Sequence, residues 1–324
     1  MALVARVHET GSPDVIRFEE VDVPPPRGTE VRVRHTAIGV NFIDTYHRRG
    51  IYPVSLPTGL GVEAAGVVEA VGEGVTRFKP GDRVVTFGPD IGSYATERVL
   101  DESLWFPIPD DISDEVAAAA FLKACTAEFL VERCAKVEPG SPVLVHAAAG
   151  GLGLLLVQWL KAVGAVVIGT VSTPAKAEAA RAAGADHIIL YTEEDTAARV
   201  REITGGAGVR VVFDGVGKAT WDASIDSCGV RGLIVVYGNA DAPTGPVDMG
   251  PLARKGSLFH TRPALYHYYA EPVERAAGAA RVWDMLRSGK LSVTIGQRYA
   301  LRDAARAHAD LEGRRTTGSS ILLP

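Results

Sequence analysis

The sequence has few cysteines and no long apolar run, and these shortages exclude several classes of protein. Its three cysteines, Cys125, Cys134 and Cys228, form no CxxC pair and no even set. Neither a disulfide scaffold nor a cysteine-rich zinc lobe is therefore expected. The most apolar run, residues 150–160, is too short to cross a bilayer, and the first residues carry no secretory signal. We expect a cytoplasmic protein without a membrane partner.

Positive charge is also in short supply. The formal net charge is −5 over 324 residues, whereas a dedicated nucleic-acid binder needs a basic face for phosphate groups. RNA is therefore not expected as a main partner. Hydrophobic residues make up 47% of the chain, which is ordinary for a soluble globular protein. At about 150 residues per domain, the length predicts two domains.

The first 120 residues alternate short apolar stretches with turn residues. Three prolines at 24–26 and Gly28 break the chain, and residues 30–38 then alternate charged with apolar side chains. That period of two is typical of a half-exposed strand. We expect an antiparallel, barrel-like β domain with strands at 2–8, 30–38, 61–71 and 83–87.

After residue 120 the sequence pattern changes, and apolar strands alternate with helical segments. This alternation predicts an α/β fold with a doubly wound parallel sheet. Two more helices, 272–288 and 301–311, precede a last strand at 319–323, and we expect this tail to return to the first domain. The expected strands of the parallel sheet are 142–146, 166–171, 188–191, 209–214, 233–237 and 257–261, and the expected helices are 151–163, 174–183, 194–203 and 220–226.

A glycine-rich loop follows the strand expected at 142–146 and opens the next helix. The sequence there is HAAAGGLG, with Gly150, Gly151 and Gly153. Glycines let a backbone approach a pyrophosphate, and a helix N-terminus offers free N–H groups to it. The first glycine of the usual G-x-G-x-x-G spacing is Ala148 here. The loop predicts dinucleotide binding, and the alternative is a glycine-rich helix start packed closely on a strand.

The choice of dinucleotide depends on the end of the second strand of this sheet. An NAD site usually has an acidic residue there for the ribose hydroxyls, but residues 168–176 contain none. Ser172, Thr173 and Lys176 instead offer two hydroxyls and an ammonium, which suit a 2′-phosphate. The segment therefore favours NADPH over NADH. The alternative is that Ser172 and Thr173 only cap the following helix and that Lys176 is a surface lysine.

Four motifs occur together in the order of one family: NFIDTY at 41–46, GLGVEAAG at 59–66, AAAGGLG at 147–153 and GSS at 318–320. With these motifs the chain resembles the NADPH:quinone oxidoreductases of the medium-chain dehydrogenase/reductase superfamily, the zeta-crystallin-like group, and especially the bacterial quinone reductases. The resemblance implies a GroES-like β-barrel catalytic domain, 1–122 with 263–324, and an inserted Rossmann NADPH-binding domain, 123–262. It also implies a homodimer joined through the Rossmann domain.

The sequence departs from the zinc alcohol dehydrogenases of the same superfamily at two metal-ligand positions. Those enzymes have a cysteine where this chain has Asn41, and a histidine where it has Val62. A catalytic zinc needs about three protein ligands, so we expect neither a catalytic zinc nor, with no cysteine between 90 and 115, a structural one. No flavin site is evident. The resemblance then implies direct hydride transfer from NADPH to a small quinone, for which the protein supplies position and polarity.

The resemblance places Asn41 and Tyr46 at the electron acceptor. Asn41 would donate a hydrogen bond to a quinone oxygen as negative charge develops there, and Tyr46 would stack on the ring or donate its hydroxyl. The alternative for Asn41 is a helix N-cap before residues 42–49. Asp44 is expected to orient this loop, and His47 to lie at the surface.

The remaining candidates are carried over from the family by their motifs. Arg262 and Thr261 are expected at the nicotinamide pocket, with Thr126 at the nicotinamide end. For each, packing or a solvated charge is the alternative. The other cofactor-binding candidates are Ala148, Gly150, Gly151, Leu152 and Gly153 in the loop, Ser172, Lys176 and Tyr191 near the 2′-phosphate, Val216, Tyr237, Gly238 and Asn239 at later strand ends, and Arg314 for the phosphates.

Two other functions compete with quinone reduction. An NADPH-dependent reductase of alkenals and enones would use the same fold and cofactor, but it must deliver a proton to carbon, which makes Tyr46 a candidate acid. Some zeta-crystallin relatives bind RNA or serve as lens proteins. The acidic balance of this chain argues against the RNA role, and the lens role leaves no mark in a sequence.

Overall fold

The computed structural model describes residues 1–324, which divide into two compact units. Unit 1 contains residues 1–122 and 293–324, and unit 2 contains residues 123–292. The chain passes from unit 1 to unit 2 after residue 122, where the sequence analysis placed the first domain boundary. It returns to unit 1 after residue 292, which is 30 residues later than the expected boundary at 262/263. Residues 263–292 remain with unit 2 because their side chains bond there. The Tyr269 hydroxyl donates to Glu128, 2.8 Å away, and Arg281 donates to Glu132, 2.9 Å away.

Unit 1 consists mainly of antiparallel sheet. Its larger sheet has the order β15-β16-β3-β5-β6-β8, with β7 paired to β3, and its smaller sheet has the order β2-β1-β4. The strands are β1 (Ala2–Val7), β2 (Arg17–Val21), β3 (Glu30–Val40), β4 (Thr58–Gly59), β5 (Glu63–Val71), β6 (Arg83–Phe87), β7 (Glu97–Asp101), β8 (Trp105–Pro107), β15 (Ile295–Ala300) and β16 (Ser319–Leu323). The helices are α1 (Phe42–Arg49), α10 (Ala304–Glu312) and the first part of α2 (Asp114–Glu128).

The tail of the chain completes unit 1. Strand β16 pairs antiparallel with β3, with Ser320 opposite Val40, so the expected return of the C-terminus to the first domain is confirmed. One apolar core cluster joins Ile38 of β3, Leu322 of β16 and Ala307 of α10. The N-terminal and C-terminal segments therefore share one hydrophobic core, and burial of that core stabilises the unit.

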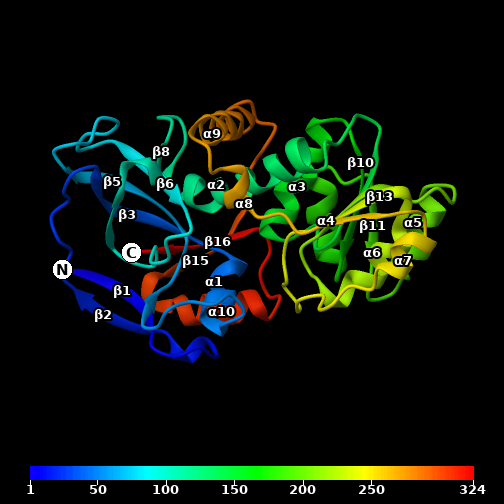
Figure 1. Cartoon of the computed structure of the whole chain (residues 1–324), viewed down its shortest axis with the longest axis horizontal. Helices are drawn as coiled ribbons and strands as arrows, with labels where there is room; N and C mark the ends of the chain where they lie inside the picture. Colours follow the sequence, from blue (N-terminus) through cyan, green and yellow to red (C-terminus); the bar gives the residue numbers. More distant parts are fainter. The chain divides into compact units, whose positions relative to one another are not determined.

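Unit 2 contains a six-stranded parallel sheet in the order β11-β10-β9-β12-β13-β14, shown on the right of Figure 1. The order reverses between β9 and β12, which is the switch point of a doubly wound fold. The strands are β9 (Pro142–Val145), β10 (Val166–Val171), β11 (His187–Leu190), β12 (Val209–Asp214), β13 (Cys228–Val236) and β14 (Phe259–Thr261). The helices are the end of α2, α3 (Gly151–Ala162), α4 (Pro174–Ala182), α5 (Thr196–Ile203), α6 (Trp221–Ser227), α7 (Met249–Arg254), α8 (Leu265–Tyr268) and α9 (Pro272–Arg287).

Several elements were not predicted, and α2 is the longest of them. This helix runs on into a π-helical segment, Phe129–Cys134. Residues 117–121 and 123–131 are all buried, so the helix is buried on nearly every side and lacks the one-sided period that identifies a surface helix. No helix in the chain is both long and apolar enough to cross a membrane.

Candidate active site

The candidate cofactor residues of unit 2 follow the carboxyl ends of its strands. Every neighbouring pair in this sheet is parallel, so all six strands end at the same edge of the sheet. Ligands of open α/β sheets bind at that edge, next to the switch point. The candidates there are Ala148 and Gly150 after β9, Ser172 after β10, Tyr191 after β11, Val216 after β12, Tyr237, Gly238 and Asn239 after β13, and Thr261 and Arg262 at the end of β14.

The loop after β9 forms a cradle of backbone. Ala147 has a left-handed φ of +53°, and the Ala148 N–H donates to the carbonyl of Thr170, 3.1 Å away. Gly150 is the N-cap of α3 and has no side chain with which to cover the end of the helix. The first-turn N–H groups of Gly151 and Leu152 thus belong to a helix terminus that favours an anion.

Gly153 is required by packing. A Cβ at this position would overlap the carbonyl oxygen of Ala147 and lie 2.8 Å from the carbonyl carbon of Ala148. Gly150 differs, since a Cβ there would lie 3.3 Å from the Ala147 oxygen at an ordinary negative φ. The close approach at Gly153 brings α3 against the loop, as in dinucleotide-binding folds, so these residues fit a pyrophosphate.

The loop after β12 is held by the buried carboxylate of Asp214, and the loop after β13 is tied to it by the Ala240 N–H, which donates to the carbonyl of Gly215 at 3.1 Å. The Asp214 carboxylate accepts the N–H groups of Val216 (2.8 Å) and Gly217 (3.0 Å). A Cβ on Gly238 would overlap the carbonyl of Gly215, which shows how closely the two loops pack. Asn239 is 7% exposed beside them. The backbone at this edge is therefore fixed by local hydrogen bonds and by close contacts between glycines.

The end of β10 carries the residues expected near a 2′-phosphate. Thr173 is the N-cap of α4, and its hydroxyl accepts the N–H of Lys176 at 3.3 Å. The capping alternative is thus correct for Thr173, while Ser172 makes no cap. Tyr191 follows the neighbouring strand β11, and its N–H donates to the carbonyl of Val171. Tyr191 therefore lies at the same sheet edge as Ser172, and 41% of its surface is exposed.

The other carried-over residues lie on different elements. Thr126 is a buried residue of α2 in unit 2. Arg262 donates to the carbonyl of Val236, the last residue of β13, 3.1 Å away. Arg314 lies in unit 1 between α10 and β16, with a φ of +56°. Asn41 and Tyr46 also belong to unit 1.

Asn41 is the N-cap of α1 and is 6% exposed. Its backbone N–H donates to the Oδ2 atom of Asp44 at 2.9 Å, and its side-chain Nδ2 donates to Oε2 of Glu63 at 2.9 Å. The other oxygen of Glu63 accepts the N–H of Leu122 at 2.7 Å. A Cβ on Gly39 would overlap the Glu63 carboxylate, so that glycine makes room for it. The Asn41 amide is held by a buried anion.

Tyr46 is buried within α1, with 4% of its surface exposed. Its ring meets the ring of Tyr52 edge-on at 5.2 Å between centroids and lies 6.3 Å from that of Phe42. The expectation for His47 was wrong, because this side chain is only 9% exposed and packs against Tyr52. Burial lowers the pKa of His47. The turn at Gly50–Tyr52, with backbone bonds to Tyr46 and His47, folds Tyr52 back over α1.

The residues around Glu63 do not fit a catalytic zinc. Glu63 is engaged by two N–H donors, Asn41 presents an amide nitrogen to it, and Val62 is apolar. No group of three His, Cys, Asp or Glu side chains in the chain could hold a metal ion.

Sequence reasoning missed the residues that hold the candidates in place. Glu63 appeared only within the GLGVEAAG motif, and Asp214 only as the last residue of an expected strand. A buried acidic residue in an otherwise apolar strand, such as the glutamate in GVEAAG, is the signal that would have identified Glu63, because a buried carboxylate requires partners.

Comparisons with known proteins agree with this geometry. Residues 27–110 match the alcohol dehydrogenase GroES-like domain family, and residues 151–267 match the zinc-binding dehydrogenase family. A quinone oxidoreductase of Pseudomonas aeruginosa is 48% identical over 97% of both chains. A 2-haloacrylate reductase of a Burkholderia species is 46% identical over 100% of this chain and 99% of its own.

A solved structure matches the whole fold. The crystal structure of Escherichia coli quinone oxidoreductase complexed with NADPH is 44% identical and superposes with a TM-score of 0.97, covering 99% of this chain and 100% of that one. The two-domain fold, a GroES-like domain and a Rossmann-like parallel sheet, is thus confirmed. On full-length similarity at this level, the chain belongs to the quinone oxidoreductase family.

Proposed function

We propose that this chain is an NADPH-dependent quinone reductase that transfers hydride directly to a small quinone, with neither zinc nor flavin. The observation that carries the proposal is the sheet edge of unit 2, where candidate residues follow all six parallel strands beside a glycine cradle. NADPH, when bound, supplies the hydride. The names of the relatives, quinone oxidoreductase in most cases, and the NADPH complex of one of them support the same assignment.

The proposed cofactor contacts divide by strand. The backbone from Ala148 to Gly153 and the start of α3 would take the pyrophosphate, since a helix N-terminus favours an anion. Ser172, Lys176 and Tyr191 would surround the 2′-phosphate; the absence of an acidic residue from 168–176 supports this. We assign Val216, Tyr237, Gly238 and Asn239 to the adenosine and ribose side, Thr126, Thr261 and Arg262 to the nicotinamide end, and Arg314 to the phosphates.

Asn41 and Tyr46 are the proposed acceptor contacts. An amide carries two N–H donors, and Glu63 accepts one of those of Asn41. The second would donate to the quinone oxygen on which negative charge develops, and a preorganised donor of this kind stabilises the transition state. Tyr46 would stack on the acceptor ring or donate its hydroxyl. The hydroquinone anion takes its proton from water, so no strong general acid is required.

The test is NADPH consumption by chelator-treated protein, with 1,2-naphthoquinone and with an alkenal as separate acceptors, repeated with NADH. We expect quinone turnover that survives chelation and prefers NADPH. Activity that disappears on chelation and returns with zinc would contradict the metal-free reaction. Equal rates with NADH would contradict the assignment of Ser172 and Lys176.

Reduction of a carbon–carbon double bond is a second candidate function. The 46% identity to a 2-haloacrylate reductase over the full chain favours it. This reaction must add a proton to carbon, and Tyr46 would be the acid. Tyr46→Phe is then expected to abolish turnover of an alkenal while retaining part of the turnover of a quinone. Equal losses with both acceptors would count against Tyr46 as the acid.

We also propose a homodimer formed through unit 2. Strand β14 is the last strand at one edge of the parallel sheet, and exposed edges invite pairing with another chain. Phe259 of this strand is 59% exposed, and Val230 of the neighbouring β13 is 74% exposed. Light scattering should find a dimer that Phe259→Glu converts to monomer. A control change at Val273, which is exposed on α9, should leave the dimer intact.

The cytoplasm is the proposed location. All three cysteines are free, and two of them are buried, which fits a reducing compartment. Cell fractionation of the producing organism is the direct test, and recovery from a secreted or membrane fraction would contradict it.

A further inference from the structure

A chain of buried hydrogen bonds crosses unit 1 and ends at Asn41. Arg48 Nη1 lies 3.0 Å from Nδ1 of His308, and Nε2 of His308 lies 3.0 Å from the hydroxyl of Tyr94. That hydroxyl donates to Oδ2 of Asp44 at 2.9 Å, the atom that also accepts the backbone N–H of Asn41. We call Arg48, His308, Tyr94 and Asp44 the buried relay. Its members are at most 1% exposed.

Chemistry sets the direction of every bond in the relay. An arginine only donates, so Nδ1 of His308 accepts, and Nε2–H of the neutral ring donates to the oxygen of Tyr94. Burial, and secondarily Arg48, lower the pKa of His308 to about 3. Burial and the charge of Asp44 raise the pKa of Tyr94 well above its ordinary value. His308 therefore remains neutral and Tyr94 keeps its proton, so the relay has a single donor–acceptor pattern.

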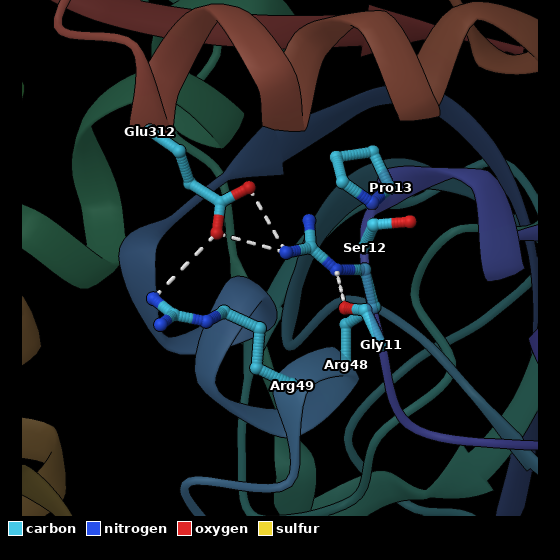
Figure 2. Close-up of a pocket in the computed structure, with 6 residues that line it drawn as sticks. All are labelled: Gly11, Ser12, Pro13, Arg48, Arg49 and Glu312. Atoms are coloured by element: carbon cyan, nitrogen blue, oxygen red, sulfur yellow. Dashed lines mark hydrogen bonds and ion pairs between the residues drawn. The ribbon is translucent and has the colours of Figure 1, made fainter.

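The fold is shaped to admit the relay. Gly61 has a φ of +84°, and a Cβ there would overlap the ring of Tyr94, with Cε1 only 2.7 Å away. At the outer end, Arg48 donates to both oxygens of Glu312 (2.8 and 2.9 Å) and to the carbonyl of Gly11 at 3.0 Å. Figure 2 shows these bonds in an open pocket, together with the ion pair between Arg49 and Glu312. The relay thus begins at a buried arginine whose guanidinium is held on several sides.

We propose that Tyr94 and His308 are positioning residues for the reductase reaction, which act through Asp44 on the backbone of Asn41 at the start of α1. Asp44 holds the Asn41 N–H with the same oxygen that accepts the hydrogen bond from Tyr94, so loss of the Tyr94 bond lets the carboxylate change its orientation. The Asn41 amide then loses its fixed direction toward an acceptor. The inference rests on the proposed function, since Asn41 must contact the acceptor for its direction to matter.

Tyr94→Phe removes one hydroxyl and keeps the ring. We expect kcat with a quinone to fall about tenfold with KM nearly unchanged, because a misaligned donor costs stabilisation of the transition state only. The matched control is Tyr299→Phe, which removes a hydroxyl bonded to Asp310 in the same unit at 2.9 Å and should leave kcat within about twofold. His308→Gln keeps an N–H donor toward Tyr94 and should retain more activity than His308→Leu.

A double-mutant cycle separates positioning from general loosening. In an Asn41→Ala background, Tyr94→Phe should reduce kcat by less than about twofold, since the donor it positions is already gone. An equal tenfold loss in both backgrounds would overturn the proposal, and so would wild-type kcat in Tyr94→Phe.

Hydrogen exchange tests the same proposal without activity. Backbone amides in a peptide covering residues 39–46 should exchange faster in Tyr94→Phe than in Tyr299→Phe. Unchanged protection would overturn the proposal. If the wild-type protein reduces no acceptor at all, the proposed function fails, whereas the exchange result still decides whether Tyr94 orders the start of α1. If Tyr94→Phe does not fold, His308→Gln against His308→Leu is measured in the same two assays.

Discussion

The two units hold their candidate residues by different means. In unit 2, the cradle and the loops at the sheet edge are held by backbone hydrogen bonds and by glycines that admit close approach, as at Gly153 and Gly238. In unit 1, the side-chain amide of Asn41 is held by Glu63, 22 positions away. Its backbone N–H is held by Asp44, which in turn accepts from the hydroxyl of Tyr94, 50 positions further along the chain.

This difference agrees with what each site is proposed to bind. A pyrophosphate is recognised by N–H groups of the main chain, which any sequence with the right turn presents. An acceptor oxygen needs one side-chain donor in one direction, and a side chain keeps its direction only when its own partners are fixed. Substitutions around Asn41 in unit 1 are thus expected to change stability and the rate of reduction. Substitutions at the sheet edge of unit 2 are expected to change cofactor affinity.

The largest effect is expected at Glu63. Glu63→Ala leaves the Asn41 amide and the Leu122 N–H without their buried acceptor, which should lower the free energy of unfolding by about 2–4 kcal/mol. Urea denaturation measures it. The control is Glu115→Ala, whose carboxylate pairs with Arg298 at the surface and should cost less than about 1 kcal/mol. Similar costs for the two variants would remove the distinction between the units.

Gly153→Ala tests the backbone cradle of unit 2. The added methyl overlaps Ala147, so the loop must shift, and we expect NADPH affinity to fall at least about tenfold, which is about 1.4 kcal/mol. Titration calorimetry measures the affinity, and circular dichroism checks the fold. Gly150→Ala is the graded comparison, because its methyl would lie 3.3 Å from the Ala147 oxygen without overlapping it, and it should lower the affinity by less than Gly153→Ala does. Unimpaired binding by Gly153→Ala would show that the cradle is not the phosphate site.

Lys176→Ala addresses the choice between the two nicotinamide cofactors. Loss of a charge-assisted hydrogen bond to the 2′-phosphate should raise KM for NADPH about fivefold to tenfold and leave KM for NADH unchanged. Lys290→Ala, at an exposed lysine of the same unit, serves as control. A rise for both cofactors would assign Lys176 a structural role instead.

The smallest expected effect is a pH dependence of stability in unit 1. Burial lowers the pKa of His308 to about 3 and that of His35 to about 4, both below the ordinary 6.5. Below about pH 6.5 the unfolded chain therefore binds more protons than the folded chain does. The stabilisation of the folded state by these neutral histidines is complete above about pH 6.5 and is lost as the pH falls toward their pKa values in the folded state. Melting temperature should fall by on the order of 2–4 °C per histidine between pH 6.5 and 5.5. His308→Gln should flatten this slope, and an unchanged slope would show that His308 does not contribute to it.

Local patterns were sufficient to predict much of the fold. The alternation of strands and helices after residue 120 predicted the parallel sheet, and the bounds of β10, β12 and β16 are those expected from the sequence. The glycines of the cradle were found by spacing. The helix α2 was not predicted because it is buried on nearly all sides. Residues 263–292 were expected in the first domain but belong to unit 2, because their partners Glu128 and Glu132 lie much earlier in the chain.

The sequence by itself determined the parts of this protein that depend on neighbours along the chain: the two kinds of sheet and the glycine-rich loop after β9. It offered the cap of α4 at Thr173 only as an alternative. Only the tertiary structure decided which residues bond Asn41 and its neighbour Asp44. Glu63, Tyr94 and His308 carry no local signature, since each becomes a partner only when β5, the segment after β6 and α10 pack together. The physical reason is burial, because a polar group removed from water must find its partner wherever the fold brings one.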